Sequence, residues 1–295
     1  MKQNKLTNLL FLSPCVFAFI MVIIIPFFLG IYYSMTDWNG VSKAITFIGL
    51  KNFTTLFQAP SFLFSFIATM VFTAINIILV NVVSFGLSLL VTSNVRFRNF
   101  YRAGFFVPNL IGGIVLGYIW QFLFNNALLK LGTSAGITFL ESSLLSHPNT
   151  VIWAMSFVNT WQYAGYIMMI YVASIQGIPA SYMEAASIDG ANYWTRMIKV
   201  QIPMMANAFT ISLFLTLTNS FKQFDMNFTL TNGGPSTRFM GKAVKSSQLL
   251  AMNIYDTAIA NKLAEAQAKA VVLFITLVVV SLIQVYFNKR KEVEM

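Results

Sequence analysis

The amino-acid sequence predicts an all-α integral membrane protein with six transmembrane helices in a single domain, residues 1–295. Three observations lead to this fold class: the composition, the length of the apolar segments and the position of the basic residues. Hydrophobic residues make up 57% of the chain and charged residues only 9%, whereas about a quarter of a typical soluble domain is charged. A helix needs about 20 mostly apolar residues to cross a bilayer. Six segments approach or exceed that length: 9–35, 62–92, 104–124, 151–176, 204–222 and 270–287.

The basic residues predict that both chain termini lie on the cytoplasmic side of the membrane. Short loops rich in Lys and Arg stay cytoplasmic, whereas long loops count little. The two termini, the link at 96–102 and the polar stretch at 177–203 hold ten of the 19 Lys and Arg residues. The net charge of +10 therefore indicates membrane topology and not nucleic-acid binding. These ten residues are Lys2, Lys5, Arg96, Arg98, Arg102, Arg196, Lys199, Lys289, Arg290 and Lys291.

The first three apolar segments contain features that bear on helix packing. Segment 9–35 is longer than the apolar region of a signal peptide and lacks a small-residue cleavage site, so we expect it to be retained. Asn76 and Asn81 in the second segment must find hydrogen-bond partners, so we expect them to face other helices. Gly113 and Gly117 in the third segment permit close helix approach, and tight packing within this chain is their simplest use.

The polar stretch between the fourth and fifth apolar segments, 177–203, predicts two short helices joined by a turn. Pro179 can open the first helix, and Gly190 can supply the left-handed residue that ends it. Asn192 can then cap the second helix. Glu184 is followed by two alanines, whose small side chains let a partner's backbone approach while the carboxylate binds an arginine.

The same stretch resembles the coupling loop of ABC importer permeases. The resemblance rests on Glu184-Ala185-Ala186, on Gly190 four residues after the second alanine, and on Ile202-Pro203 at the far end. The whole segment also contains Ile178-Pro179 and Ile188-Asp189-Gly190-Ala191, and with these residues it is similar to the sugar-importing branch in particular. Two further segments also resemble sugar permeases: 47–53, and 230–235, which follows Phe224-Asp225. Met197 departs from the family, which usually has an aromatic residue there.

The resemblance implies a type I permease fold and uptake of a sugar or oligosaccharide across a bacterial plasma membrane. It implies a non-catalytic subunit without a cofactor of its own, because a separate ATPase binds ATP and Mg²⁺. The partners it implies are a related second permease that forms a heterodimer with this chain, two cytoplasmic ATPase subunits and an extracytoplasmic sugar-binding protein. The residues implied in ATPase coupling are Glu184, Ala185, Ala186, Asp189, Gly190 and Pro203.

A sugar that crosses the membrane needs hydrogen-bonding groups and ring faces inside a shared cavity. On the fourth segment, Asn159, Tyr163 and Tyr166 are spaced by four and three residues, so they share one helical face. Asn219 and Gln223 repeat a four-residue spacing at the end of the fifth segment. Bonding between helices explains each of these side chains equally well. The candidate substrate path is Asn159, Gln162, Tyr163, Tyr166, Asn219 and Gln223.

Other classes of function remain as alternatives. The solute could be an amino acid, phosphate or another anion, and a six-span channel or an intramembrane enzyme would also have this composition. Gly241-Lys242 is not the end of a phosphate-binding loop, because Ser236 and Ala243 occupy positions where that motif needs glycine and a hydroxyl residue. The lone Cys15 and the lone His147 have no nearby ligand types that would indicate a metal site.

Overall fold

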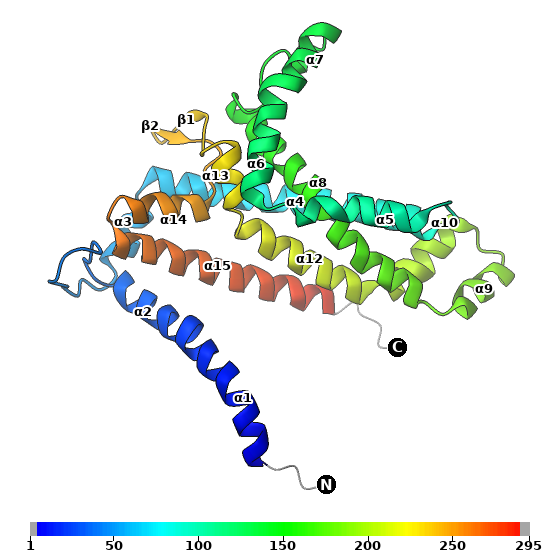
Figure 1. Cartoon of the computed structure of the whole chain (residues 1–295), viewed down its shortest axis with the longest axis horizontal. Coiled ribbons are helices and arrows are strands. Elements are labelled where there is room, and N and C mark those ends of the chain that lie inside the picture. The colour runs from blue at the N-terminus through cyan, green and yellow to red at the C-terminus, as the bar shows by residue number, and fades with distance from the viewer. Residues whose placement is uncertain (1–4, 290–295) are drawn as a thin grey trace. The chain divides into compact units, whose positions relative to one another are not determined.

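The computed structural model of this protein describes residues 5–289 and is almost entirely helical (Figure 1). It divides into two compact units, and each unit draws on two parts of the chain. The first unit runs up to Ala59 and also contains Asn253–Phe274. The second contains Pro60–Met252 and the residues from Ile275 onward. Of the basic residues used to predict topology, Lys2, Arg290 and Lys291 lie outside the described residues.

The first unit begins with a long apolar helix whose end is tied to the loop that follows. α1 (Lys5–Phe19) continues through a π-helical turn (Ile20–Ile24) into α2 (Ile25–Ser34). A loop then leads to α3 (Lys51–Leu56). The Asn52 amide donates to the carbonyl oxygens of Ser34 and Thr36, both at 2.8 Å. One side chain from the 47–53 segment thus satisfies carbonyls left open at the end of α2.

The second half of the first unit comes from α14 (Leu250–Ile259) and the beginning of α15 (Leu263–Lys289). Lys269 is buried there, yet its charge is paired, as burial requires. Its Nζ donates to Oγ1 of Thr257 at 2.7 Å and lies 3.1 Å from Oε1 of Glu265.

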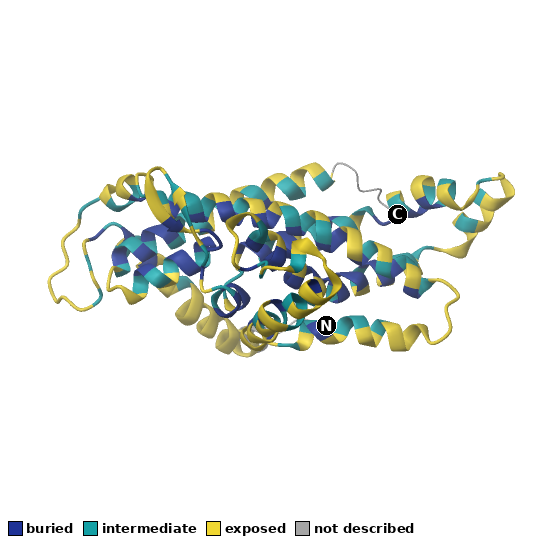
Figure 2. Ribbon diagram, turned by 90° about the horizontal axis from the view of Figure 1, so that it is seen from above, coloured by how far each residue is buried: buried dark blue, intermediate teal, exposed yellow. Residues whose placement is uncertain are grey.

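The second unit is built on two long helices that pack along each other, α4 (Pro60–Thr92) and α8 (Pro148–Gly177). α12 (Ala206–Phe221) packs on α4, and α6 (Gly113–Phe122) packs on α13 (Asp225–Leu230). The buried side chains follow the contacts among these helices, as the dark ribbon in Figure 2 shows. The core between α4, α6, α8 and α13 includes Phe72, Leu116, Val151, Met155, Met226 and Leu230.

Shorter elements connect the long helices of the second unit. Two of them form an antiparallel hairpin, in which Thr237 pairs with Val244. The connecting elements are α5 (Arg98–Phe106), a 3-10 turn (Val107–Leu110), a π turn (Leu123–Ala127), α7 (Leu128–Ala135), a 3-10 turn (Thr138–Leu140), α9 (Ala180–Ile188), α10 (Tyr193–Arg196), a π turn (Met197–Gln201), α11 (Ile202–Met204), β1 (Ser236–Phe239) and β2 (Lys242–Lys245).

The expectation that the two asparagines of the second apolar segment face other helices is confirmed. Asn76 is fully buried on α4 and its amide donates to Ser156 Oγ on α8 at 3.3 Å. Asn81 lies one turn further along α4, and its amide donates to Thr216 Oγ1 on α12 at 3.4 Å. These bonds satisfy polar groups that lipid could not.

The apolar helices overlap most of the expected segments, but 104–124 is displaced, and α8, which contains 151–176, is not among them. Among the described residues, the helices long and apolar enough to cross a membrane are Leu10–Ser34, Pro60–Thr92, Gly113–Ala135 and Leu263–Lys289, with a fifth crossing if Tyr193–Met204 and Ala206–Phe221, bent by 69°, count as one. The expected segment 104–124 is interrupted instead of continuous. α5 ends at Phe106 and α6 begins only at Gly113, because Pro108 lacks an N–H and Gly112 is extended (φ −60°, ψ 141°).

Candidate functional site

α9 and α10 form the two short helices expected in the stretch 177–203, at one end of the second unit (Figure 1). α9 ends in a left-handed glycine, since Gly190 has φ +78°. The Gly190 N–H donates to the Ser187 carbonyl at 3.1 Å, and the Ala191 N–H donates to the Ala186 carbonyl at 3.0 Å. These two bonds define the Schellman ending that glycine permits. Asn192 caps α10 by accepting from the Thr195 N–H at 2.9 Å, as the sequence predicts.

This helix pair is held together locally and presents its side chains outward. Arg196 Nη1 donates to Ser187 Oγ at 2.5 Å, which joins the end of α10 to the end of α9. Ile188 is 86% exposed and Trp194 64% exposed, and no residue of α9 is buried, as the exposed colours at this end of the ribbon show (Figure 2). The six predicted coupling residues are all accessible: Glu184, Ala185, Asp189, Gly190 and Pro203 are exposed, and Ala186 is half-buried.

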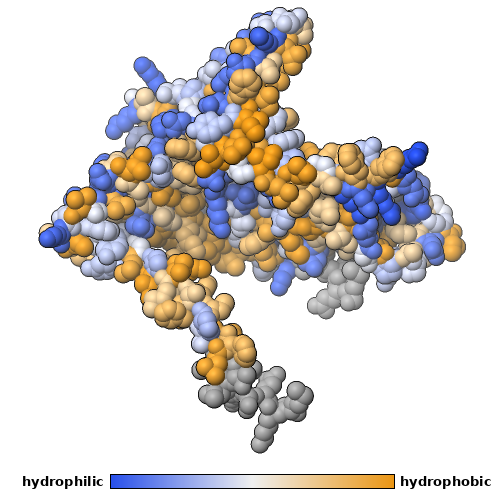
Figure 3. Space-filling model, viewed as in Figure 1, coloured by the Kyte–Doolittle hydropathy of each residue, from blue (hydrophilic) through white to orange (hydrophobic). Residues whose placement is uncertain are grey.

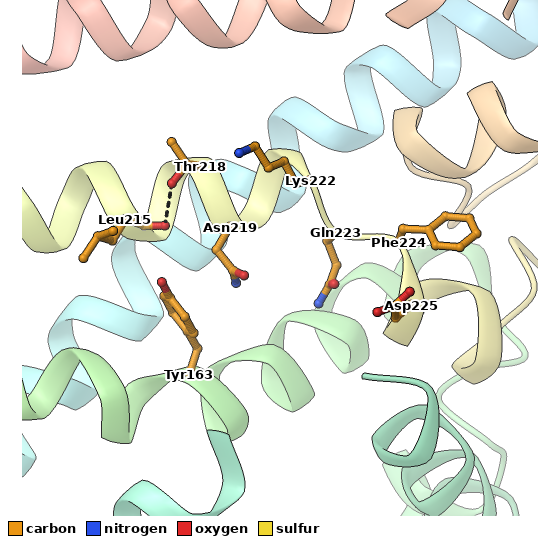
Figure 4. Close-up of a pocket in the computed structure, with 8 residues that line it drawn as sticks. All are labelled: Tyr163, Leu215, Thr218, Asn219, Lys222, Gln223, Phe224 and Asp225. Atoms are coloured by element: carbon orange, nitrogen blue, oxygen red, sulfur yellow. Dashed lines mark hydrogen bonds between the residues drawn. The ribbon is translucent and has the colours of Figure 1, made fainter. Parts of the chain in front are cut away.

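A polar cavity of about 390 Å³ lies between α8 and the end of α12. Figure 4 shows the Tyr163 ring rising from α8 toward Asn219 of α12, with the Gln223 amide and the Asp225 carboxylate further along the same opening. The Lys222 ammonium points toward the other side of α12 in this view. The lining residues are Tyr163, Leu215, Thr218, Asn219, Lys222, Gln223, Phe224 and Asp225.

A buried asparagine positions two of the amides that line this cavity. Asn159 on α8 is fully buried. Its Oδ1 accepts from Gln223 Nε2 at 3.1 Å and from Asn219 Nδ2 at 3.4 Å, and its Nδ2 donates to Asn76 Oδ1 at 2.7 Å. The bonds therefore connect α4, α8 and the α12 end through one side chain. We call Asn76, Asn159, Asn219 and Gln223 the amide cluster.

The structure brings four of the six predicted path residues together and places the other two elsewhere. Tyr163, Asn219 and Gln223 line the cavity, and Asn159 lies behind them. Gln162 instead donates from Nε2 to the Ile111 carbonyl at 2.9 Å, where α6 has not yet begun. Tyr166 contacts the Tyr163 ring with a 5.3 Å centroid separation but lines a different, apolar hollow.

Two charged residues of the cavity were not among the predicted path residues. Lys222 and Asp225 line it, and they are the only charged residues between Lys199 and Arg238. That isolation is the signal in the sequence that could have identified them. Within the part of the chain that the structure describes, neither side chain forms an ion pair.

The glycine pair of the third apolar segment sets the position of Asp225. A Cβ added at Gly113 would lie 2.8 Å from the Cβ of Asp225, and one at Gly117 would overlap Thr229 Oγ1. The two glycines therefore let α13 pack directly on α6, with Asp225 as its first residue. The close approach expected from these glycines is confirmed, and its partner belongs to the same chain.

Comparison with known proteins identifies the family. The model of the binding-protein-dependent transport system inner membrane component matches residues 6–293. The chain belongs to this family. It is therefore a multi-pass permease component of the cytoplasmic membrane, and ATP hydrolysis in its importer is carried out by a separate ATPase.

Individual relatives cover almost the whole permease. It is 45% identical over 294 residues to the probable starch degradation products transport system permease protein AmyD of Thermoanaerobacterium thermosulfurigenes. This alignment covers 99% of this chain and 97% of that protein. It is 30% identical over 269 residues to the multiple sugar-binding transport system permease protein MsmF of Streptococcus mutans, covering 91% and 90%. A bacterial ABC transporter that imports alginate shares the fold, with a TM-score of 0.79, 16% identity and coverage of 97% and 96%. The permease thus has the type I ABC importer fold.

Proposed function

We propose that this permease takes up a sugar or an oligosaccharide as one subunit of an ATP-driven importer. The observation that carries the proposal is its 45% identity, over nearly its full length, to a permease named for starch degradation products. The relative named for multiple sugars supports the same substrate class. In this proposed function no side chain of the permease reacts with the solute, and the permease provides the solute's route across the membrane.

In the proposed topology the chain forms one transmembrane domain with six crossings and both termini in the cytoplasm. Four apolar helices supply four crossings, and α12, the second helix of the bent pair, supplies the fifth. α8 supplies the sixth: its 30 residues span about 45 Å as a helix. Its polar side chains are directed into protein contacts, as Asn159 illustrates, which supports a crossing despite its lower hydropathy.

The segment 177–203, with α9 and α10, is the proposed docking surface for the ATPase. Glu184, Ala185, Ala186, Asp189, Gly190 and Pro203 would contact it directly. Exposed apolar side chains such as Ile188 and Trp194 favour a partner, because contiguous exposed apolar groups commonly mark interaction sites. Closure of the ATPase on ATP would move this segment and shift the permease between inward-facing and outward-facing states. Such a shift requires that the closed ATPase bind one of these two states more tightly than the other.

The proposed assembly contains a second, related permease, two ATPase subunits that bind ATP and Mg²⁺, and an extracytoplasmic binding protein. The family description itself names binding-protein dependence. An alginate ABC transporter structure with the same fold includes a periplasmic protein bound to an alginate pentasaccharide. A heterodimer of permeases is the form we propose.

The polar cavity is the proposed part of the solute path within this chain. The Tyr163 ring offers a face on which a sugar ring can stack, and the Asn219 and Gln223 amides offer donors and acceptors to hydroxyl groups. Asn159 would hold the two amides in place. Gln162 and Tyr166, the other two predicted path residues, lie outside this part of the path, because Gln162 donates to the Ile111 carbonyl and Tyr166 lines a separate hollow. A phosphorylated solute is the alternative, since more distant relatives are named for sn-glycerol 3-phosphate transport.

The test is uptake by the complete importer reconstituted in proteoliposomes with its binding protein. Labelled malto-oligosaccharide should enter only with ATP inside, and sn-glycerol 3-phosphate should not compete. Asn219→Ala should reduce uptake by about fivefold, since losing one hydrogen bond costs about 1 kcal/mol, while loaded binding protein still stimulates ATP hydrolysis. Asn126→Ala, an exposed asparagine outside the cavity, is the matched control. ATP-dependent uptake of labelled sn-glycerol 3-phosphate, without malto-oligosaccharide uptake, would overturn the substrate class.

A further inference from the structure

α5 combines clustered positive charge with exposed aromatic side chains. Arg96, Arg98 and Arg102 fall within seven residues of one another, and the sequence contains no acidic residue between Asp37 and Glu141. Arg98 and Arg102 are one helical turn apart, so they share a face of α5. Phe97 is 67% exposed and Phe100 75% exposed. Figure 3 shows hydrophilic and hydrophobic residues side by side over this end of the second unit.

Beside these arginines lies an apolar hollow of about 460 Å³ between α5 and α8. Arg102 is its only charged lining residue, and Ala103, Met169 and Ala173 leave it open to the outside of the unit. Close to this hollow α5 contacts α8 directly, since a Cβ on Gly165 would overlap the Phe105 carbonyl. The lining residues are Arg102, Ala103, Phe106, Tyr166, Met169, Ile170 and Ala173.

The Arg102 guanidinium is anchored at the mouth of this hollow by one hydrogen bond, and one of its other donors has no acceptor among the described residues. Nη2 donates to the Val91 carbonyl at 3.2 Å, in the last turn of α4. Nε is shielded from solvent and, among the described residues, has no hydrogen-bond partner. None of the three arginines forms an ion pair with any described side chain. A buried donor left unpaired is unfavourable, so an acceptor from outside the chain would stabilise this arrangement.

We propose that the hollow between α5 and α8 binds an anionic phospholipid, with its phosphate on Arg98 and Arg102 and an acyl chain against Phe106, Tyr166 and Ile170. Guanidinium groups bind phosphate through paired hydrogen bonds, and basic pockets between membrane helices are suited to anionic headgroups. An acidic protein surface would match the arginines but not the apolar hollow beneath them. The proposal assigns Tyr166 to lipid contact and does not depend on which solute is carried.

The experiment uses the purified importer complex in nanodiscs that contain phosphatidylglycerol with a photoactivatable acyl chain. Illumination should label peptides from 98–106 and 166–173. An otherwise identical phosphatidylcholine probe should label them much less. Replacing either arginine, as Arg98→Gln or Arg102→Gln, should reduce phosphatidylglycerol labelling about fivefold, since each basic residue near a membrane surface contributes about 1 kcal/mol to anionic-lipid binding.

A second pair of variants separates the hollow from the charge. Ala173→Phe fills the hollow and leaves all arginines in place, so it should also abolish labelling of 166–173. Lys130→Gln on α7 removes an exposed charge elsewhere and should leave labelling unchanged. Recovery of the intact complex by size exclusion checks the folding of each variant. Three results would each overturn the proposal. They are equal labelling by the two lipids, unchanged labelling in Ala173→Phe, and crosslinking of this site to a protein subunit in place of lipid.

Discussion

Asn159 and Glu184 are both polar side chains, but among the described residues only Asn159 has hydrogen-bond partners for its side chain. Asn159 is fully buried and makes bonds to three other members of the amide cluster. Glu184 is exposed on α9, and no described residue forms an ion pair with it. A polar group surrounded by helices in a membrane must form its hydrogen bonds within the protein, whereas one at the surface is accessible to a partner protein. The amide cluster should therefore control stability, and the α9–α10 segment should control coupling.

Asn159→Leu should have the largest effect on stability. Leucine removes the acceptor of the half-buried Asn219 and Gln223 amides and the donor to Asn76, which is fully buried and loses that partner. We expect a loss of about 3 kcal/mol in the free energy of unfolding, at the upper end of the range for unsatisfied buried groups. The melting temperature of the detergent-purified permease, followed by size-exclusion fluorescence, measures it. Asn126→Leu is the exposed control, and equal melting temperatures for the two variants would remove the distinction drawn for the amide cluster.

Gly190→Val should have an effect on stability between those of the other two variants, because it alters a local turn without disturbing packing. No heavy atom lies within 4 Å of a Cβ built at Gly190, so strain comes only from its φ of +78°. That conformation disfavours a β-branched residue by about 1–2 kcal/mol. Gly177→Val is the matched control, since its surroundings are equally open and its φ is not positive. We expect Gly190→Val to lower ATP-driven uptake sharply while Gly177→Val retains it; similar uptake by both variants would mean that the turn at 190 is not needed.

Glu184→Lys should have the smallest effect on stability, within about 0.5 kcal/mol of the unchanged protein, as is usual for exposed positions. It should nevertheless abolish uptake and reduce co-purification of the ATPase, because a like charge would then face the partner's arginine. Glu141→Lys, also exposed, controls for charge reversal elsewhere. If Glu184→Lys lowers the melting temperature as much as Asn159→Leu, the comparison between the two regions fails. If uptake survives, the docking role of Glu184 is wrong.

The sequence alone determined the features that depend on neighbours close in the chain. Gly190 and Asn192 act on N–H and carbonyl groups within five residues, so the turn and the cap followed from residue type and spacing. Composition determined the membrane class, because bilayer thickness fixes the length of an apolar helix. The burial of Asn76 and Asn81 was also predictable, since lipid offers amides no partner. What could be predicted was that these amides have partners, not which ones.

Only the tertiary structure decided which distant residues meet. Helical spacing placed Gln162, Tyr163 and Tyr166 near one another on α8, yet packing sends Gln162 to the Ile111 carbonyl and Tyr166 to the α5 hollow. The cavity itself depends on the end of α12 meeting α8, and Asp225 reaches it because α13 packs on two glycines of α6. Helical periodicity fixes the direction of a side chain around its own axis, but its partners depend on how separate helices pack, which a single-helix pattern does not encode.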